Sequence, residues 1–270
     1  MFSSKQNYHA LMDATLKHPF TMVIAGPSGS GKSTFVEKLL LARDDIINKK
    51  FNYIYFILGT DLQENEIFSD LIYELKKSIE KVQVIELNNS EYMTKQQVIK
   101  PEFYKDLQSA LKQHHEHQQQ GCVIFDDLMQ ELVQTSNILV KCFTVLSTHC
   151  SVSFIYLTQN LFSGGSGKST SDMVSVYRNT KYLVLFQSNM DNSSVALVVR
   201  KMGPGGKRNE ILREMLNQIM SENRYVLIRS DIPELKYCSD IFQEKEIFSP
   251  IIKEQVKFMK VFSPNFGGAK

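Results

Sequence analysis

The segment that most constrains this chain is a glycine-rich stretch, GPSGSGKST, at residues 26–34. It follows a short apolar run, TMVIAG, and precedes residues 34–42, whose apolar positions recur at helical spacing. Gly26 and Gly31, with the Lys-Ser pair that follows, fit the G-x-x-x-x-G-K-[ST] pattern of a P-loop. The pattern predicts a strand, a tight loop and a helix in direct succession.

The composition of this loop has a mechanical reason. Its three glycines let the backbone N–H groups turn inward around an anion, and the helix N-terminus adds partial positive charge. In such a loop the lysine, here Lys32, reaches the β- and γ-phosphates, and the hydroxyl of Ser33 ligates Mg²⁺. The sequence therefore predicts a nucleoside triphosphate site formed by Gly26, Pro27, Ser28, Gly29, Ser30, Gly31, Lys32, Ser33 and Thr34.

Strand-like and helix-like segments alternate along most of the chain. The predicted strands are residues 21–26, 52–59, 82–87, 121–127, 151–159, 181–187 and 224–232. The predicted helices are residues 34–42, 66–81, a segment starting at Pro101, 136–149, 171–178, 193–202 and 209–222. Apolar strands that alternate with helices predict a mainly parallel sheet covered on both faces. The predicted fold class is α/β, a P-loop NTPase fold with three α/β/α layers.

Two adjacent acids follow the buried strand VIF at residues 123–125. We expect Asp126 to hold Mg²⁺ and Asp127 to orient and polarise an attacking water, because a P-loop needs an acid at the end of a neighbouring strand. An N-cap role for Asp127 is the alternative.

The next predicted strand closes with Thr158 and Gln159. Open α/β sheets bind their ligands at the carboxyl edge, so Gln159 should face the same site. Its amide can hydrogen-bond both the attacking water and the γ-phosphate, and so report on the nucleotide state. A plain amide at a strand end is the alternative.

A second Gly-Lys-Ser-Thr sequence closes the stretch FSGGSGKST at residues 162–170. Phe162 stands where a P-loop requires its first glycine, so we interpret residues 163–170 as a Gly/Ser loop with Lys168 at its tip. A second phosphate site is the alternative. A loop directly after Gln159 could move with hydrolysis.

Composition limits the class of protein and of partner. The chain has 270 residues, about the size of one large domain, with 43% hydrophobic and 22% charged residues, typical of globular proteins. The net charge of +2 is small, so any polyanion must bind to a local patch. The longest apolar runs fall far short of the ~20 residues of a membrane span, and no secretory signal is visible at the start. We therefore expect no membrane association and an intracellular protein.

The four cysteines show no paired spacing and lie in apolar stretches, so we expect buried thiols rather than disulfides or a metal site: Cys122, Cys142, Cys150 and Cys238. The cluster of His114, His115 and His117 with Glu116 is expected to be a solvated helix end, with a metal site as the alternative.

The late strands lack the Asn-Lys-x-Asp guanine reader of regulatory GTPases, and no Arg-rich lid of a small-molecule kinase is present. The chain offers only a group of basic residues that form no compact motif: Arg200, Lys201, Lys207, Arg208 and Arg213. These residues could form a solvated face, supply an arginine to the active site of a neighbouring subunit, or contact a polyanion.

Five segments together resemble the FtsK–HerA-type genome-packaging ATPases of poxviruses and other large eukaryotic DNA viruses, virophages and polinton-like elements. They are HPFTMVIAGPSGSGKSTF, VIFDDL, THCSVSFIYLTQNLF, NTKYLVLFQSNMD and VVRKMGP, and the similarity spans roughly residues 19–232. The resemblance implies a Mg²⁺-dependent ATPase that acts as a homo-oligomeric ring and drives double-stranded DNA into a preformed capsid.

The resemblance also assigns roles. It implies that residues 26–34 are the Walker A loop, that Asp126 and Asp127 are the Walker B acids, and that Gln159 is the strand-end sensor. Arg200 is the first choice for the arginine supplied to a neighbour's γ-phosphate, with Arg178 as the alternative. Asp127 departs from the Glu of many members of the superfamily. Lys168 becomes a candidate DNA contact.

We expect three parts: an N-terminal extension at 1–18, a P-loop ATPase domain at 19–242 and a C-terminal tail or arm at 243–270, which packs either on a neighbour or on its own domain. The implied partners are double-stranded DNA and a capsid or other virion protein, inside the host cell where virus is assembled or in the virion. The alternative functions are a P-loop phosphotransferase or another soluble NTPase without a DNA role, and a nucleotide-stabilised assembly protein.

Overall fold

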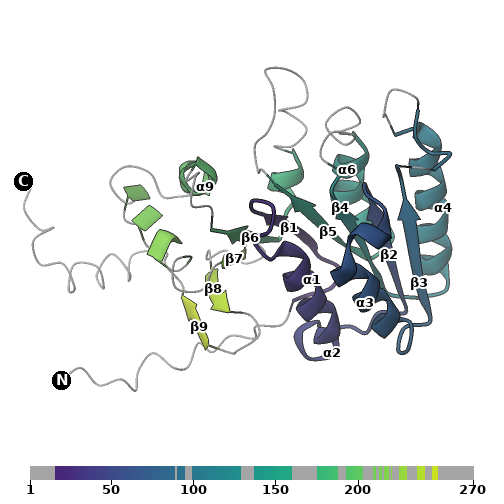
Figure 1. Ribbon diagram of the computed structural model, residues 1–270, viewed down its shortest axis with the longest axis horizontal. Helices are drawn as coiled ribbons and strands as arrows, with labels where there is room; N and C mark the ends of the chain where they lie inside the picture. Colours follow the sequence, from purple (N-terminus) through teal and green to yellow (C-terminus); the bar gives the residue numbers. More distant parts are fainter. Residues whose placement is uncertain are drawn as a thin grey trace, which may run out of the picture.

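A nine-stranded sheet runs through the molecule in the order β3-β2-β4-β5-β1-β6-β7-β8-β9 (Figure 1). The computed structural model describes residues 16–88, 90–94, 99–128, 137–159, 175–187 and 193–202, and shorter stretches between 209 and 248. The strands are β1 (Thr21–Ala25), β2 (Tyr53–Leu58), β3 (Lys81–Glu86), β4 (Gly121–Asp126), β5 (Val152–Thr158), β6 (Tyr182–Phe186), β7 (Tyr225–Arg229), β8 (Lys236–Asp240) and β9 (Lys245–Phe248).

The six strands from β3 to β6 pair in parallel, whereas β7, β8 and β9 pair antiparallel. The register aligns the carboxyl ends of the central strands: Ala25 pairs with Thr158, and Leu58 pairs with Asp126. Loops that follow β1, β2, β4 and β5 therefore emerge at one edge of the sheet.

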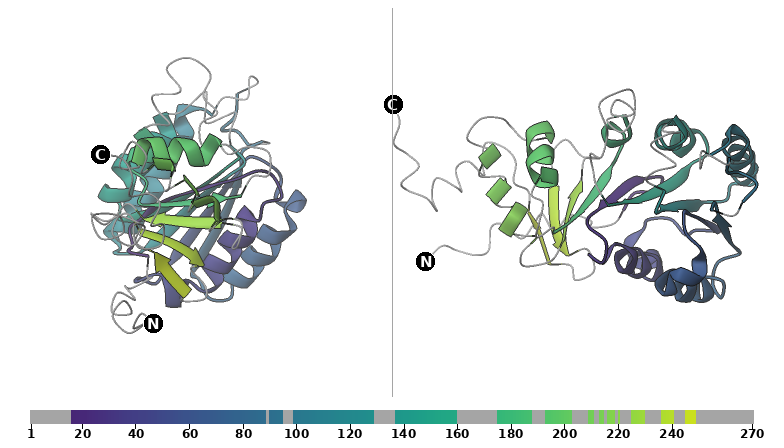
Figure 2. Two further views of the ribbon diagram at one scale, coloured as in Figure 1. Left: turned by 90° about the vertical axis from the view of Figure 1, so that its left-hand side faces the viewer. Right: turned by 45° about the horizontal axis from the view of Figure 1, so that its top comes forward.

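Helices cover both faces of the sheet (Figure 2, right). They are α1 (Lys32–Leu41), α2 (Arg43–Ile46), η2 (Leu62–Glu64), α3 (Glu66–Leu75), α4 (Pro101–Glu116), α6 (Asn137–Lys141), the π-helical turn η3 (Cys142–Leu146), α7 (Ser147–His149) and α9 (Ser193–Met202). One apolar layer packs α1 and α3 against the sheet, and the other packs α4, α6, η3 and α9 against it. The architecture is the α/β/α arrangement that the alternating segments predict.

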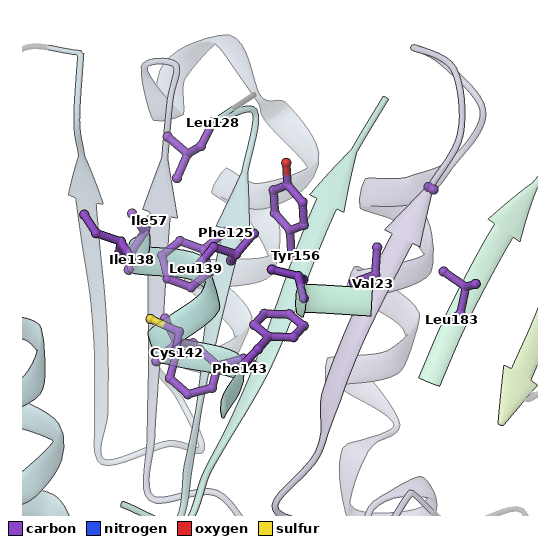
Figure 3. Close-up of a cluster of buried hydrophobic side chains, with 14 of the residues drawn as sticks. Val23, Ile57, Phe125, Leu128, Ile138, Leu139, Cys142, Phe143, Tyr156 and Leu183 are labelled. Carbon is purple, nitrogen blue, oxygen red and sulfur yellow. The ribbon is translucent and has the colours of Figure 1, made fainter. Parts of the chain in front are cut away.

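The second of these layers is drawn in Figure 3, where Phe125 and Tyr156, on the neighbouring strands β4 and β5, belong to the same cluster as Leu139 and Phe143. Every one of these side chains is almost fully buried. The strands carry long apolar runs because both of their faces are covered. This rigid platform fixes the loops at the carboxyl edge.

The predicted strands all form, and α9 has the predicted bounds. The predicted helix at 136–149 is interrupted by the π-helical turn η3. Strands β8 and β9, which the sequence pattern does not predict, extend the sheet beyond β7. Strand β9 comes from the predicted tail, residues 243–270, and pairs with β8 of its own chain.

Cys122, Cys142 and Cys150 are free and buried, as the sequence predicts, and burial raises the pKa of each thiol. The side chain of Cys238 lies outside the described residues. No helix in the described part of the chain is both long and apolar enough to cross a bilayer.

Two buried histidines lie near the amino ends of the strands. His114 stacks on Tyr53 at 3.9 Å between ring centroids, its Nε2 accepts a hydrogen bond from the Tyr55 hydroxyl at 2.7 Å, and its Nδ1 donates to Gln119. His114 is 9% exposed, so a solvated helix end is wrong for this residue. Both ring nitrogens are engaged within the protein, which leaves neither for a metal ion.

His18 forms a similar link. Its Nε2 donates to the Ser151 carbonyl at 2.9 Å, and its Nδ1 accepts from the Ser153 hydroxyl at 2.7 Å. Because each histidine uses one nitrogen as an acceptor, protonation would break a bond. Burial lowers the pKa of both His18 and His114 below the ordinary 6.5.

We expect these two histidines to weaken the fold in mild acid. With a lowered pKa in the folded protein, the unfolded chain binds more protons as the pH falls through about 6.5, so the free energy of unfolding decreases. Urea midpoints at about pH 7.5 and pH 5.5 measure this loss. It should be smaller in His18→Gln and His114→Gln than in the parent, and an unchanged loss in both variants would contradict the assignment.

Candidate nucleotide site

The loop between β1 and α1 has the backbone that a phosphate cradle requires. Gly29 and Gly31 adopt φ values of 72° and 104°, in the left-handed region that favours glycine. Gly31 is the N-cap of α1, and no side chain caps the first turn. The N–H groups at the start of α1 therefore stay available for an anion.

Gly26 is required for a different reason, because its neighbours leave no room for a side chain. A Cβ at this position would lie 2.5 Å from the Cβ of Phe186 on β6 and 2.9 Å from the Ser30 hydroxyl. Phe186 in turn packs on Phe35 and Tyr225, with ring centroids 6.2 and 5.4 Å away. The loop thus packs directly against an aromatic cluster, which fixes its position relative to the sheet.

Lys32 lies in the first turn of α1 and folds over the loop. Its Nζ donates to the carbonyl oxygens of Gly26 and Pro27 at 2.8 and 2.9 Å. Burial lowers its pKa, and the nearby charges of Asp126 and Asp127 oppose that shift. The ammonium group is therefore held at the mouth of the loop, facing two acids.

Most of the predicted nucleotide-site residues meet around one cavity of about 660 Å³. Its lining includes six P-loop residues, both acids and the end of β5: Ser28, Gly29, Gly31, Lys32, Ser33, Thr34, Asp126, Asp127, Leu157, Thr158 and Gln159. Gly26, Pro27 and Ser30 belong to the loop but do not line the cavity. Gln159 is exposed directly after β5 and lines the cavity at this edge.

The two acids differ in their surroundings. Asp126 is the last residue of β4, and burial followed by the charge of Asp127 raises its pKa to about 6, against the opposing effect of Lys32. Asp127 is exposed and adopts φ 53°. A left-handed conformation is uncommon for a non-glycine residue, and such positions gather at functional sites. Both carboxylates line the cavity, the half-buried Asp126 at the end of β4 and the exposed Asp127 directly after it.

Gly59, which follows β2, fixes the backbone of this turn. Its N–H donates to the carbonyl of Asp126 at 2.9 Å, and a Cβ on it would lie 2.0 Å from the carbonyl oxygen of Asp127. No side chain fits there unless the acidic turn moves.

We therefore expect Gly59→Ala to reduce nucleotide turnover by about 10²-fold, since a displacement near 1 Å at a reacting group costs that much. Steady-state phosphate release would measure the loss. Gly121→Ala is the matched control: its Cβ would meet the Tyr53 ring at 2.4 Å at the other edge of the sheet, so it lowers stability without moving the acids. Equal turnover in folded samples of both variants would contradict this role for Gly59.

The cavity has further lining residues that the sequence motifs do not predict. The segment that joins β2 to α3 contributes Thr60, Gln63, Glu64 and Asn65, and the first turn of α3 contributes Glu66 and Ile67. Asn65 donates from Nδ2 to Oδ2 of Asp126 at 3.4 Å. In the sequence, only the position of this segment indicates that it lies at the site, since it follows a strand that ends at the same edge of the sheet.

The donor set fits Mg²⁺. Ser33 supplies a hydroxyl and Asp126 a carboxylate to the lining of one cavity, and Mg²⁺ prefers oxygen ligands, with one or two from the protein and others from phosphates and water.

The two candidate arginines lie in different places. Arg178 is exposed next to Asn179, whose carbonyl accepts a hydrogen bond from the Thr21 hydroxyl at the start of β1. It therefore lies at the amino edge of the sheet, away from the cavity. Arg200 is exposed on α9. Lys168 and the loop 163–170, like Lys207 and Arg208, lie outside the described residues.

Comparison with known proteins gives a family match over nearly the whole chain. A family model described as Poxvirus A32 protein matches residues 7–263. The DNA packaging protein OPG160 of variola virus is 24% identical over 270 residues, which covers 94% of this chain and 88% of that protein. The DNA packaging protein OPG160 of vaccinia virus (strain Copenhagen) is 26% identical over 256 residues, covering 91% and 84%.

Among solved structures, the genome packaging NTPase B204 of Sulfolobus turreted icosahedral virus 2, in complex with ATP-gammaS, is similar with a TM-score of 0.46 and 14% identity, covering 86% of this chain and 98% of that one. The KaiC-like protein PH0186 of Pyrococcus horikoshii has a TM-score of 0.38 and 12% identity, covering 64% and 76%.

Proposed function

Because this chain belongs to the poxvirus A32 protein family, we propose that it is an ATP-hydrolysing motor that moves double-stranded DNA into a viral capsid. The observation that carries the proposal is one cavity at the carboxyl edge of the sheet, where the P-loop, two acids and Gln159 meet. Its relatives in variola and vaccinia virus bear the name DNA packaging protein.

In this proposal each group has one task. The N–H groups of the loop and of the first turn of α1 bind the phosphates, and Lys32 turns its ammonium group from Gly26 and Pro27 toward them. Asp127 orients the attacking water and accepts its proton, and Gln159 holds the same water from the end of β5. Mg²⁺, when held by Ser33 and Asp126, supplies positive charge to the phosphates.

The proposed motor works as a homo-oligomeric ring that docks on a capsid or other virion protein, at the sites of virus assembly inside the infected cell. Phosphate release from ATP, with Mg²⁺ and with EDTA in its place, tests the catalytic part. We expect release only with the divalent cation, and no release under either condition would contradict an ATPase.

A ring lets one subunit supply an arginine to its neighbour's γ-phosphate, and we propose Arg200 for this task. Arg200→Ala and Lys32→Ala subunits should each be inactive alone, yet their mixture should regain hydrolysis, because mixed interfaces pair an intact P-loop with an intact arginine. Phosphate release from mixtures at varied ratios provides the measurement. Recovery with Arg178→Ala subunits, and none with Arg200→Ala subunits, would transfer the role to Arg178.

A further inference from the structure

Asn65, the residue directly before α3, makes hydrogen bonds to two different parts of the molecule. Asn65 is the N-cap of α3, and its Oδ1 accepts the Phe68 N–H at 3.1 Å. The Nδ2 of the same amide donates to Oδ2 of Asp126, 3.4 Å away at the end of β4. One side chain therefore joins the start of a helix to an acid in the cavity.

The segment that carries Asn65 is anchored along its length. Gly59 N–H donates to the Asp126 carbonyl at 2.9 Å, and Leu62 N–H donates to Oε1 of Glu86 at the end of β3, also at 2.9 Å. Ser69 on α3 donates its hydroxyl to the Leu62 carbonyl at 3.1 Å. These bonds hold the backbone of Asn65 at a fixed distance from β4.

Helix α3 is in turn fixed by packing. Its face of Phe68, Leu71, Ile72 and Leu75 is buried in the same apolar layer as α1, the helix that begins at Lys32. The Asn65 amide is thus presented to Asp126 by a rigid frame that also supports the P-loop. A carboxylate that accepts a hydrogen bond from such a frame keeps one rotamer, whereas a free carboxylate samples several.

We propose that Asn65 is a positioning residue of the nucleotide site, which holds the Asp126 carboxylate toward the cavity so that it receives the divalent cation of the bound nucleotide. The inference rests on the proposed function and deepens it. Asn65 itself acts through Asp126 and does not need to touch the nucleotide.

Two substitutions separate this role from helix capping. Asn65→Ser keeps an N-cap acceptor for the Phe68 N–H but loses the amide donor to Asp126, whereas Asn65→Ala loses both. If Asn65 positions Asp126, both variants bind Mg²⁺·ATPγS more weakly and only Asn65→Ala is less stable. If Asn65 only caps α3, Asn65→Ser behaves as the parent in both respects.

The measurement is the dissociation constant of ATPγS by calorimetry, with Mg²⁺ and with EDTA, on the full chain, together with thermal unfolding. We expect about a 10-fold loss of affinity in Mg²⁺ for Asn65→Ser, the scale of one hydrogen bond to a charged group, and no loss in EDTA. Asn52→Ser is the matched control, because the Asn52 Oδ1 accepts the Gln120 N–H at the opposite edge of the sheet.

Parental affinity of Asn65→Ser in Mg²⁺ would overturn the proposal, and so would an equal loss in Mg²⁺ and EDTA, which would mean a general distortion of the site. A parent protein that binds no nucleotide would overturn the proposed function instead. The two failures are therefore distinguishable.

Discussion

Lys32→Ala is expected to lower nucleotide turnover by at least about 10³-fold, the upper scale for removing one group that stabilises charge at a reacting centre. The Lys32 ammonium group faces Asp126 and Asp127 across the cavity, and its contacts in the loop are hydrogen bonds to two carbonyl oxygens, those of Gly26 and Pro27. The side chain contributes little to the apolar layer beneath, so the variant should remain folded.

Phosphate release and calorimetric binding of ATPγS measure the two effects of this substitution, and thermal unfolding checks the fold. Lys38→Ala is the control, since Lys38 is exposed in the last turn of the same helix and does not line the cavity. Turnover near that of the parent in folded Lys32→Ala protein would contradict the assignment of residues 26–34 as a P-loop.

Asp127→Asn is expected to bind Mg²⁺·ATP yet hydrolyse it about 10²–10⁴-fold more slowly, the usual range for loss of a general base. Asparagine keeps the shape of the side chain and is among the few residues that tolerate the left-handed backbone found here, φ 53°. The turn should therefore keep its geometry while the amide can no longer accept a proton.

Single-turnover hydrolysis measured beside ATPγS binding separates the two steps for Asp127→Asn. Unchanged binding with slow hydrolysis supports the assignment. Lost binding would instead mean that Asp127 holds the divalent cation, and the roles of the two acids would be exchanged.

The sequence predicts those parts of the site that are defined by residues close together in the chain. The P-loop pattern lies within nine consecutive residues, and the acids and Gln159 each end an apolar strand, so a local pattern indicates their place at the carboxyl edge. Family membership, predicted from the same segments, is confirmed by the match over residues 7–263. The roles of the individual residues stay predictions.

The parts that the sequence did not predict depend on contacts between distant residues. Asn65 and Asp126 are 61 positions apart, and the close approach of Gly59 to Asp127 exists only once β2 and β4 pair. Strands β8 and β9 mix polar with apolar residues, so they lack the continuous apolar run of the central strands.

His114 is a different case, because a usable signal was present. Phe103, Leu107, Leu111 and His114 recur at helical spacing, and all four lie on the buried face of α4. This spacing indicates that His114 lies with the core, whereas the neighbouring His115 and His117 favour a polar helix end.

The measurement that tests the central claim most directly is ATP hydrolysis by the full chain with and without long linear duplex DNA, read beside its size in solution. A DNA motor should assemble into a ring and hydrolyse ATP faster when duplex is present, with a stimulation that falls as salt rises, because Lys and Arg contacts to phosphates release counterions. The stimulation should not depend on base sequence, since phosphate contacts carry no sequence information. Hydrolysis that duplex DNA leaves unchanged at low salt, in an assembled ring, would contradict the account.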